Sequence, residues 1–389
     1  MKIIQYCQHI LGIGHLFRSL QIAKALCNHE VILVTGGPHV DANFPEHVRE
    51  FCLPDLQMDH EFRGLFSTDP HATLEHVRKE RLRRLLVLFE KEAPDLFIVE
   101  LYPFGRKAFR FELDPVLEAI REHRLPSCGV VCSLRDILVE KEDQERHESR
   151  AVRTLNRYFD AVLVHADPGF VKIEETFFHL DEVTIPLVYT GYIAPKIEAD
   201  SRAKIRKRLG ISEDEILIVA SAGGGSVGTP LLESAINAFK QLNVERSKYL
   251  RVYTGPFIGK ENFNLLKSKA VSEIMIEEFA SDFLSYLAAA DLSISMAGYN
   301  TSMSILSTKV PALVWPFSNN HEQGLRAERF AEIGALRVLE DQDLLPERLA
   351  EIMAQTLSRP SRVTTNIELD GADNTARWIE AWEKGNGKR

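Results

Sequence analysis

The sequence predicts the α/β class, with two doubly wound domains that are each built on a parallel sheet covered by helices. Three observations support this prediction. Short apolar segments alternate with longer amphipathic ones, and 389 residues are enough to bury two separate cores. A glycine-rich loop follows the first expected strand of each half, and the alternation restarts after the polar stretch 194–207. We expect the two halves to face each other across a cleft, where ligands commonly bind.

The first half begins with a strand at residues 2–8, the loop HILGIG and a helix from residue 15 to about 27. Its other expected strands are 31–35, 48–53, 95–100, 126–132, 161–165 and 187–189, and its other helices are 70–92, 112–123 and 144–158. Strands separated by helices of this length predict parallel pairing, because parallel neighbours need a long crossover connection.

The second half repeats this pattern after a linker. We place a first domain at 1–194, a linker with Pro195 and mixed charge at 195–207, a second domain at 208–371 and a terminal helix at 372–389. The expected strands of the second domain are 215–222, 250–254, 273–277, 292–296, 312–317 and 336–339. Its expected helices are 230–242, 281–290, 300–310, one starting near 321, and 345–357.

Composition excludes some classes of function. A net charge of -9 gives no reason for bulk binding to nucleic acid. The spacing of Cys128 and Cys132 is neither a zinc-finger spacing nor a redox Cys-x-x-Cys, so we expect reduced core thiols. The chain opens directly on a strand without a basic leader, and it contains no apolar run of transmembrane length. We therefore expect a cytoplasmic protein.

The loop 223–229 is the first candidate binding element. Consecutive glycines let backbone N–H groups approach a diphosphate, and the N-terminus of the following helix adds partial positive charge. The loop is not a Walker loop and it misses the strict dinucleotide spacing. The alternative is an ordinary tight turn between a strand and a helix.

His15 is the candidate base of the first half. It follows Gly14 in the first turn of its helix, where the positive end of the helix dipole disfavours the imidazolium. A neutral His15 could accept a proton near pH 7, and Arg18 lies one turn further on. The alternative is a structural or solvated histidine.

Residues 291–329 contain two loops that leave neighbouring strands at the same sheet edge. The first loop breaks at Gly298 and offers the side chains of Asn300 and Thr301, and the second carries Glu322 and Gln323. Glu322 and Gln323 could hold sugar hydroxyls, since together they accept and donate hydrogen bonds. Alternatively they form only the polar first turn of a helix.

Two further features of the first half carry weaker signals. Glu100 and the pair Arg135 and Asp136 follow strands and are candidates for binding an acceptor. The basic run 78–84 overlaps an apolar stripe with helical spacing. We expect a core-facing helix with a solvated basic face, and the alternative is contact with a membrane surface.

Several of these motifs together resemble a known family. The segments GIGHLFRSL, YTGYIAP, SAGGGSVG, EFASDF, the turn at Gly298 to Thr301 and HEQ, in this order, are similar to GT-B-fold glycosyltransferases of family 28, typified by the cell-wall N-acetylglucosaminyltransferase. LRDIL and DAVLVHADP are closest to a set of bacterial predicted glycosyltransferases of unknown acceptor. The similarity extends over nearly the whole chain.

The resemblance implies an inverting transfer of a hexose or N-acetylhexosamine from a nucleoside-diphosphate sugar, with uridine as the expected nucleoside, to an acceptor hydroxyl. No metal or other cofactor is implied. His15 would be the base, with Gly14, Arg18, Glu100, Arg135 and Asp136 on the acceptor side, and the terminal helix would return to the first domain. The donor nucleotide would contact Gly224, Gly225, Ser226, Phe279, Ala280, Gly298, Tyr299, Asn300, Thr301 and Ser304, and the donor sugar would contact Glu322 and Gln323.

Ser304 departs from the family pattern, which has a glutamate at this position to hold the ribose diol. A serine accepts hydrogen bonds less strongly than a carboxylate and has a shorter reach. Ser304 therefore leaves open a nucleotide-sugar-binding protein without catalysis. A second alternative is a nucleotide-sugar hydrolase, because Gly-x-Gly-His-x-x-Arg at residues 12–18 also resembles the hydrolases of nonulosonic-acid synthesis. The acceptor, lipid-linked or a small glycan, is not specified, and a lipid-linked acceptor would place the protein at the inner face of a membrane.

Overall fold

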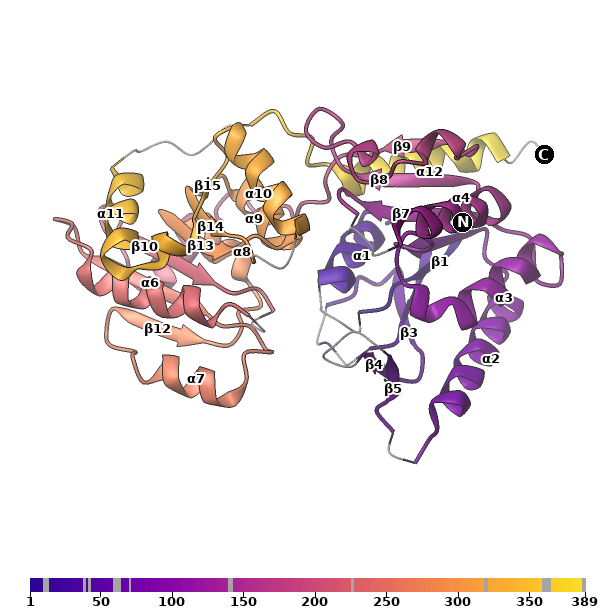
Figure 1. The fold of residues 1–389 in the computed structure, drawn as a ribbon, viewed down its shortest axis with the longest axis horizontal. Helices are drawn as coiled ribbons and strands as arrows, with labels where there is room; N and C mark the ends of the chain where they lie inside the picture. Colours follow the sequence, from indigo (N-terminus) through magenta and orange to yellow (C-terminus); the bar gives the residue numbers. More distant parts are fainter. Residues whose placement is uncertain are drawn as a thin grey trace. The chain divides into compact units, whose positions relative to one another are not determined.

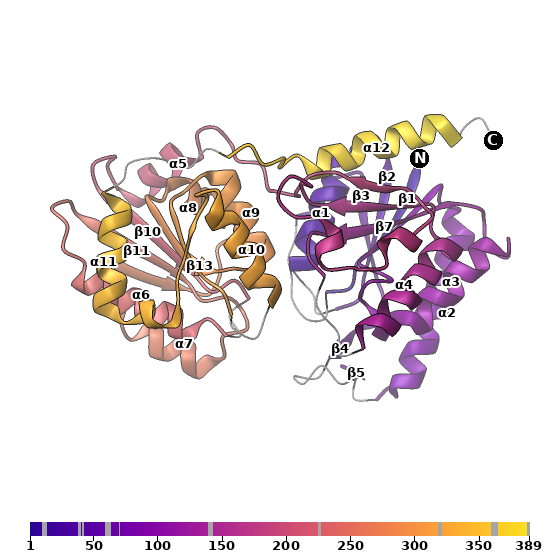
Figure 2. The ribbon, with the colours of Figure 1, turned by 45° about the horizontal axis from the view of Figure 1, so that its top comes forward.

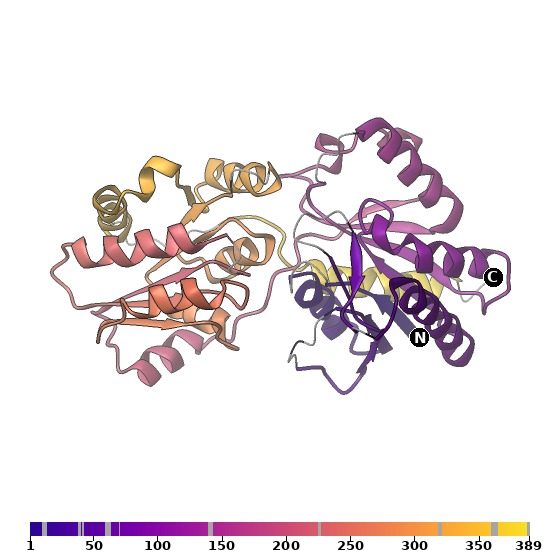
Figure 3. The same ribbon diagram turned by 60° about the horizontal axis from the view of Figure 1, so that its bottom comes forward.

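The computed structural model describes residues 1–9, 14–37, 40, 43–58, 64–69, 71–138, 143–224, 227–317, 321–358 and 365–386. The chain forms two compact units (Figure 1). The first consists of Met1–Ile193 together with Ile367–Arg389, and the second of Ala194–Asn366. Helices lie on both faces of the sheet within each unit (Figure 2, Figure 3).

The first unit is built on a seven-stranded sheet in the order β3-β2-β1-β6-β7-β8-β9, and all its strand pairs are parallel. The strands are β1 (Lys2–Tyr6), β2 (Glu30–Thr35), β3 (Val48–Cys52), β6 (Leu96–Glu100), β7 (Gly129–Arg135), β8 (Ala161–His165) and β9 (Leu187–Tyr189). A small antiparallel hairpin, β4 (Leu56–Met58) and β5 (Leu65–Ser67), lies outside the sheet. The central strands are buried on both faces, which explains their continuous apolar sequences.

Five helices cover this sheet: α1 (Gly14–Ala25), α2 (Leu74–Glu92), α3 (Arg110–Arg121), α4 (Gln144–Tyr158) and α12 (Gly371–Asn386). Helix α12, shown in yellow in Figure 2, packs beside α1 on one face, and α2, α3 and α4 cover the other. Ile379 of α12 is fully buried in the core under α1. A Cβ atom on Gly129 would lie 2.1 Å from Cη2 of Trp382, so this glycine makes room for the indole ring.

The second unit has a six-stranded parallel sheet in the order β12-β11-β10-β13-β14-β15. The strands are β10 (Ile216–Ser221), β11 (Lys248–Tyr253), β12 (Ile274–Glu277), β13 (Leu292–Met296), β14 (Ala312–Trp315) and β15 (Arg337–Val338). The helices are α5 (Ser201–Leu209), α6 (Thr229–Gln241), α7 (Lys260–Lys267), α8 (Phe283–Ala289), α9 (Tyr299–Thr308), α10 (His321–Glu332) and α11 (Pro346–Leu357). Helices α6 and α11 pack together over the main core, and α5 packs on α8.

Each sheet reverses its strand order once. The reversal lies between β1 and β6 in the first unit and between β10 and β13 in the second. At such a point the loops leaving the two central strands diverge to opposite faces of the sheet, which opens a crevice at the carboxyl ends of the strands. These two switch points are therefore the places in the fold where ligand-binding groups are expected.

The expected linker at 195–207 contains most of helix α5, which belongs to the second unit. The guanidinium group of Arg202 donates to the carbonyl of Ala289 at 2.8 Å, and that of Arg206 donates to the same carbonyl at 3.0 Å. Both side chains also pair with Asp291. The two arginines thus satisfy a carbonyl at the end of α8, and the charges that suggested a solvated linker bind a buried helix end.

The basic run on α2 also differs from the expectation of a wholly solvated basic face. Arg81 is fully buried, with two N–H groups on Glu112 at 2.7 and 2.8 Å, one on Gln8 and one on the carbonyl of Pro54. Its neighbours Arg83 and Arg84 are exposed and pair with Glu80. The central arginine of the run therefore ties α2 to α3 and to loops at the carboxyl edge of the sheet.

The expectation of reduced core cysteines is confirmed for Cys128 and Cys132, which are both free and buried. Burial raises the pKa of the Cys128 thiol to about 12, so it stays protonated at neutral pH.

Candidate active site

The switch point of the first unit brings His15 onto Glu100. Helix α1 starts at Gly14, directly after the loop that follows β1, and Glu100 is the last residue of β6. Nδ1 of His15 lies 2.7 Å from Oε1 of Glu100. A carboxylate accepts only, so Nδ1 carries the hydrogen and the lone pair lies on Nε2. This is the arrangement of a histidine base oriented by an acid.

Two arginines complete the cluster. Arg18, one turn after His15 on α1, donates through Nη2 to the same Oε1 of Glu100. Arg106 donates to Oε2 through Nε at 3.3 Å and through Nη2 at 3.1 Å. The side chain of Glu100 is only 1% exposed, whereas that of His15 is 19% exposed. The carboxylate of Glu100 and the guanidinium groups of Arg18 and Arg106 are therefore buried, whereas the imidazole of His15 is partly accessible.

The surroundings keep this imidazole neutral. Burial, followed by the positive charge of Arg106, lowers the pKa of His15 to about 3. Burial alone would raise the pKa of Glu100, but its contacts with His15, Arg106 and Arg18 outweigh burial and hold that pKa well below its ordinary value. At physiological pH the imidazole of His15 is therefore neutral and Glu100 is ionised, so Nε2 carries a lone pair.

The other acceptor-side candidates lie near this edge. Gly14 is the first residue of α1, and Arg135 ends β7, the strand that pairs with β6. Asp136 follows and is fully buried. Sequence reasoning missed Arg106. Its signal is Gly105, which marks a turn directly after the strand that ends in Glu100.

At the switch point of the second unit, main-chain atoms of glycine-containing loops lie close together. Gly223 and Gly255 have left-handed φ values of 62° and 81°. A Cβ atom on Gly255 would lie 2.3 Å from the carbonyl oxygen of Gly223, so the loops after β10 and β11 touch through main chain alone. The N–H of Phe257 donates to the carbonyl of Gly224 at 2.9 Å and ties the two loops together. Gly225 and Ser226, also expected here, lie outside the described residues.

The loop after β13 joins this turn. Helix α9 begins at Tyr299, with Gly298 at its N-cap and no side-chain cap. Oγ1 of Thr301 lies 4.0 Å from the positions that a Cβ would take on Gly223 and on Gly298, so its hydroxyl stands between the two glycine loops. Asn300, which follows Tyr299 on the same turn, is half-buried. The N-terminal N–H groups of α9 and the glycine turn together form a polar cradle with partial positive charge.

Glu322 and Gln323 are engaged within the second unit. Glu322, in the first turn of α10, accepts from Nη2 of Arg326 at 2.6 Å, and both side chains are buried. The guanidinium of Arg326 lies over the ring of Tyr299, 5.2 Å from its centroid. Oε1 of Gln323 accepts from the N–H of Phe317 at 3.2 Å. The ion pair of Glu322 with Arg326 thus links α10 to Tyr299 at the start of α9. Sequence reasoning did not predict this link.

Ser304 uses its hydroxyl inside its own helix, where it donates to the carbonyl of Asn300 at 2.9 Å. Phe279, 55% exposed, follows β12 by two residues, and Ala280 comes next in the chain. Phe257 is 51% exposed, and its ring would be 3.6 Å from a Cβ on Gly224. Sequence reasoning missed Phe257, although an aromatic residue between two glycines after a strand is a recognisable signal.

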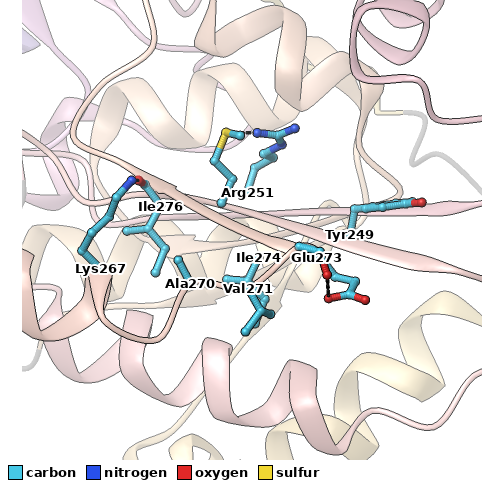
Figure 4. A pocket seen from close by; sticks show the side chains of 10 residues that line it. Tyr249, Arg251, Lys267, Ala270, Val271, Glu273, Ile274 and Ile276 are labelled. Carbon is cyan, nitrogen blue, oxygen red and sulfur yellow. Dashed lines mark hydrogen bonds between the residues drawn. The ribbon is translucent and has the colours of Figure 1, made fainter.

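A separate hollow of about 240 Å³ lies on the edge of the second sheet, beside β12 (Figure 4). Lys267, Val271 and Ile274 are among the residues that line it. The ammonium group of Lys267 donates to the carbonyl of Ile276, and Arg251 donates to Sδ of Met275. The polar groups of the hollow are therefore turned to the protein itself.

Within the described part of the chain, no three His, Cys, Asp or Glu side chains are grouped so that they could hold a metal ion. In the same residues, no helix combines the length and the apolar character that crossing a membrane requires.

The residues that form the glycine cradle match a known domain family. Residues 219–375 match the glycosyltransferase family 28 C-terminal domain. The match starts within β10, includes both glycine loops of the cradle and extends into α12. The expected resemblance to family 28 is therefore confirmed.

One relative is the UDP-N-acetylglucosamine–N-acetylmuramyl-(pentapeptide) pyrophosphoryl-undecaprenol N-acetylglucosamine transferase of Carboxydothermus hydrogenoformans. It is 28% identical over 179 residues, which are 44% of this chain and 47% of the relative. The match thus spans about half the length of that relative.

Solved structures extend the likeness to the whole chain. MurG of Acinetobacter baumannii superimposes with a TM-score of 0.55 at 17% identity, covering 97% of this chain and 95% of the other. The UDP-GlcNAc 2-epimerase of Methanocaldococcus jannaschii gives 0.61 at 13% identity, covering 99% and 100%. At these identities the likeness shows the fold, which is GT-B as expected, with two Rossmann-like domains, and the family 28 domain is the second of them.

Proposed function

We propose that this protein is an inverting, metal-independent glycosyltransferase that moves a hexose or N-acetylhexosamine from a nucleoside-diphosphate sugar, with uridine as the nucleoside, to an acceptor hydroxyl. One observation carries the proposal: a neutral histidine held by an ionised glutamate lies at one switch point, and a glycine cradle lies at the other. The first suits deprotonation of a hydroxyl, and the second suits a diphosphate. The names of the relative and of the epimerase, which both contain UDP-N-acetylglucosamine or its abbreviation, support the choice of donor.

In the proposed reaction, the acceptor oxygen forms a bond to the anomeric carbon while the bond from that carbon to the diphosphate oxygen breaks. Nε2 of His15 takes the proton of the hydroxyl, and Glu100 stabilises the resulting imidazolium through Nδ1. The leaving nucleoside diphosphate takes the electron pair. Main-chain N–H groups near Gly224 and at the start of α9 stabilise its charge, as a metal ion does elsewhere.

The experiment is a donor assay without metal, joined to calorimetry with uridine, guanosine, thymidine and cytidine diphosphates. We expect micromolar binding of uridine diphosphate, and transfer of sugar from its N-acetylglucosamine conjugate to an acceptor from a screen of glycans and lipid-linked sugars. Binding of none of the four nucleotides would contradict the proposal and favour another donor class.

A nucleotide-sugar hydrolase is the second candidate. The likeness to an epimerase favours this candidate, because the same fold then also occurs in an enzyme that is not named as a transferase. In a hydrolase, His15 would deprotonate water. Breakdown of the donor at the full catalytic rate without any acceptor would support the hydrolase, whereas a rate that rises at least tenfold with an acceptor would support the transferase.

A further inference from the structure

The turn that follows Glu100 holds two residues other than glycine in the left-handed backbone conformation. Leu101 has a φ of 65° and Arg106 a φ of 58°. The N–H of Gly105 closes the turn by donating to the carbonyl of Leu101 at 2.8 Å. Such a conformation is disfavoured for residues other than glycine and persists only where the surroundings enforce it. This strained segment, which we call the 101–106 turn, is therefore enforced by what its side chains contact.

Arg106 is the side chain that the turn presents to the cluster. Two of its N–H groups approach a single oxygen of Glu100, Oε2, at 3.1 and 3.3 Å. The other oxygen, Oε1, is left to His15 and Arg18. Because Arg106 occupies one oxygen and is itself only 7% exposed, it restricts rotation of the carboxylate about its side-chain bonds.

We propose that Arg106 is a positioning residue for the proton transfer assigned to His15. Held by the 101–106 turn, Arg106 keeps Glu100 in the orientation that places Oε1 on Nδ1 of His15, and its charge opposes a second positive charge on the imidazole. This role rests on the proposed function, because Arg106 acts through Glu100 and His15.

Groups on several neighbouring elements interact electrostatically with this cluster. They include Arg18 on α1, Cys7 after β1, Cys132 on β7 and His165 at the end of β8. Burial raises the pKa of both thiols, that of Cys7 to about 12, and it lowers the pKa of His165 to about 3, so these three groups are neutral. Among these described groups, the charges that oppose protonation of His15 are therefore those of Arg18 and Arg106.

The test measures the protonation of His15 in the protein without nucleotide or sugar. NMR monitors the histidine ring signals as the pH is changed, and His15→Gln identifies the signals that belong to His15. In the unsubstituted protein we expect His15 to remain neutral down to about pH 4, since its pKa is about 3. In Arg106→Gln we expect the midpoint to rise by about one pH unit or more, because a nearby positive charge that disfavours the imidazolium is lost. Arg106→Lys, which keeps the charge but loses the two-point contact, should give a smaller rise.

A matched control is Arg121→Gln, at the other end of α3. Arg121 pairs with Asp160 and donates to the carbonyl of Tyr158 in the same unit, outside the 101–106 turn. Its replacement should leave the His15 midpoint where it is. In the donor assay, Arg106→Gln should lower kcat by about tenfold with unchanged affinity for uridine diphosphate, the pattern expected for a group that supports the proton transfer.

A folded Arg106→Gln protein in which His15 titrates as in the unsubstituted protein would overturn the proposal. If this variant does not fold, Arg106→Lys replaces it, because it keeps the charge but loses the two-point contact with Glu100. An unchanged midpoint there would equally overturn the proposal. Because the titration contains no substrate, a shifted midpoint in a protein that binds no nucleotide would contradict only the proposed function.

Discussion

The two switch points occupy equivalent places in their sheets, but one is lined by side chains and the other by main chain. In the first unit, the switch point between β1 and β6 carries the neutral imidazole of His15 and the charged side chains of Arg18, Glu100 and Arg106. In the second unit, the switch point between β10 and β13 is formed by main chain at Gly223, Gly224, Gly255 and Gly298. Side chains can be tuned in charge and protonation state, whereas glycine loops provide space and N–H groups. The first suits a reacting proton and the second a fixed anion.

The largest expected effect comes from removing the imidazole. We expect His15→Gln to lower kcat by about 10²–10⁴-fold, the usual contribution of a general base. Affinity for uridine diphosphate should change less than about twofold, since the nucleotide is assigned to the other switch point. Steady-state kinetics and calorimetry on one preparation test both statements. Equal losses of turnover and affinity would show that the division of labour between the two units is wrong.

The next effect concerns the glycine cradle. Gly255→Ala and Gly259→Ala both place a side chain at a φ near 80°, but only the Cβ on residue 255 meets another loop, at Gly223. We expect Gly255→Ala to weaken binding of uridine diphosphate by about ten- to hundredfold, which corresponds to about 1–3 kcal/mol. Gly259→Ala should have little effect on binding. Similar losses in both variants would indicate backbone strain and leave the cradle without support.

Acid should destabilise the first unit through its buried histidines. The pKa values of His15 and His165 are lowered to about 3 by burial, whereas an unfolded histidine titrates near its ordinary value. The unfolded chain therefore binds more protons below about pH 6.5, and stability falls as the pH falls toward 3. At pH 5 the loss is on the order of 1–2 kcal/mol for each histidine.

Urea unfolding at pH 7 and pH 5 measures this loss. His15→Gln should reduce the difference between the two pH values, whereas His71→Gln at an exposed position should not. An unchanged difference in the His15 variant would mean that His15 titrates normally in the folded protein.

The smallest expected effect is at Ser304. Its hydroxyl is spent on the carbonyl of Asn300, so it has little to offer a ligand. Ser304→Glu should tighten uridine diphosphate by about tenfold if a ribose diol lies there, the size of one additional charge-assisted hydrogen bond. Ser304→Ala should leave affinity unchanged. If the glutamate brings no gain, the departure from the family pattern at this position does not limit nucleotide binding.

The sequence predicted the features that are encoded locally. The strands, the glycine loop at 223–229 and the placement of His15 at a helix start all follow from short-range patterns. The partnership of His15 with Glu100 did not, because the two residues are 85 positions apart and only the sheet order brings them together.

Charge was the main source of error. A basic run reads as solvated, yet Arg81 and Arg206 are buried because each finds carboxylates and carbonyls that together use most of its N–H groups. Neither partner set is adjacent in the sequence. By contrast, the pairing of Glu322 with Arg326 has helical spacing and could have been anticipated.

Helix α12 has a consequence for how the protein is made. Residues after 366 complete the first unit, in which Asn374 donates to the carbonyl of Thr190 and Trp382 lies against Gly129. The second unit is one uninterrupted segment of chain and can fold as soon as it leaves the ribosome. The first unit begins synthesis earlier but leaves the surface under α12 uncovered until α12 itself has been made. During biosynthesis, the unit made first is therefore the one finished last.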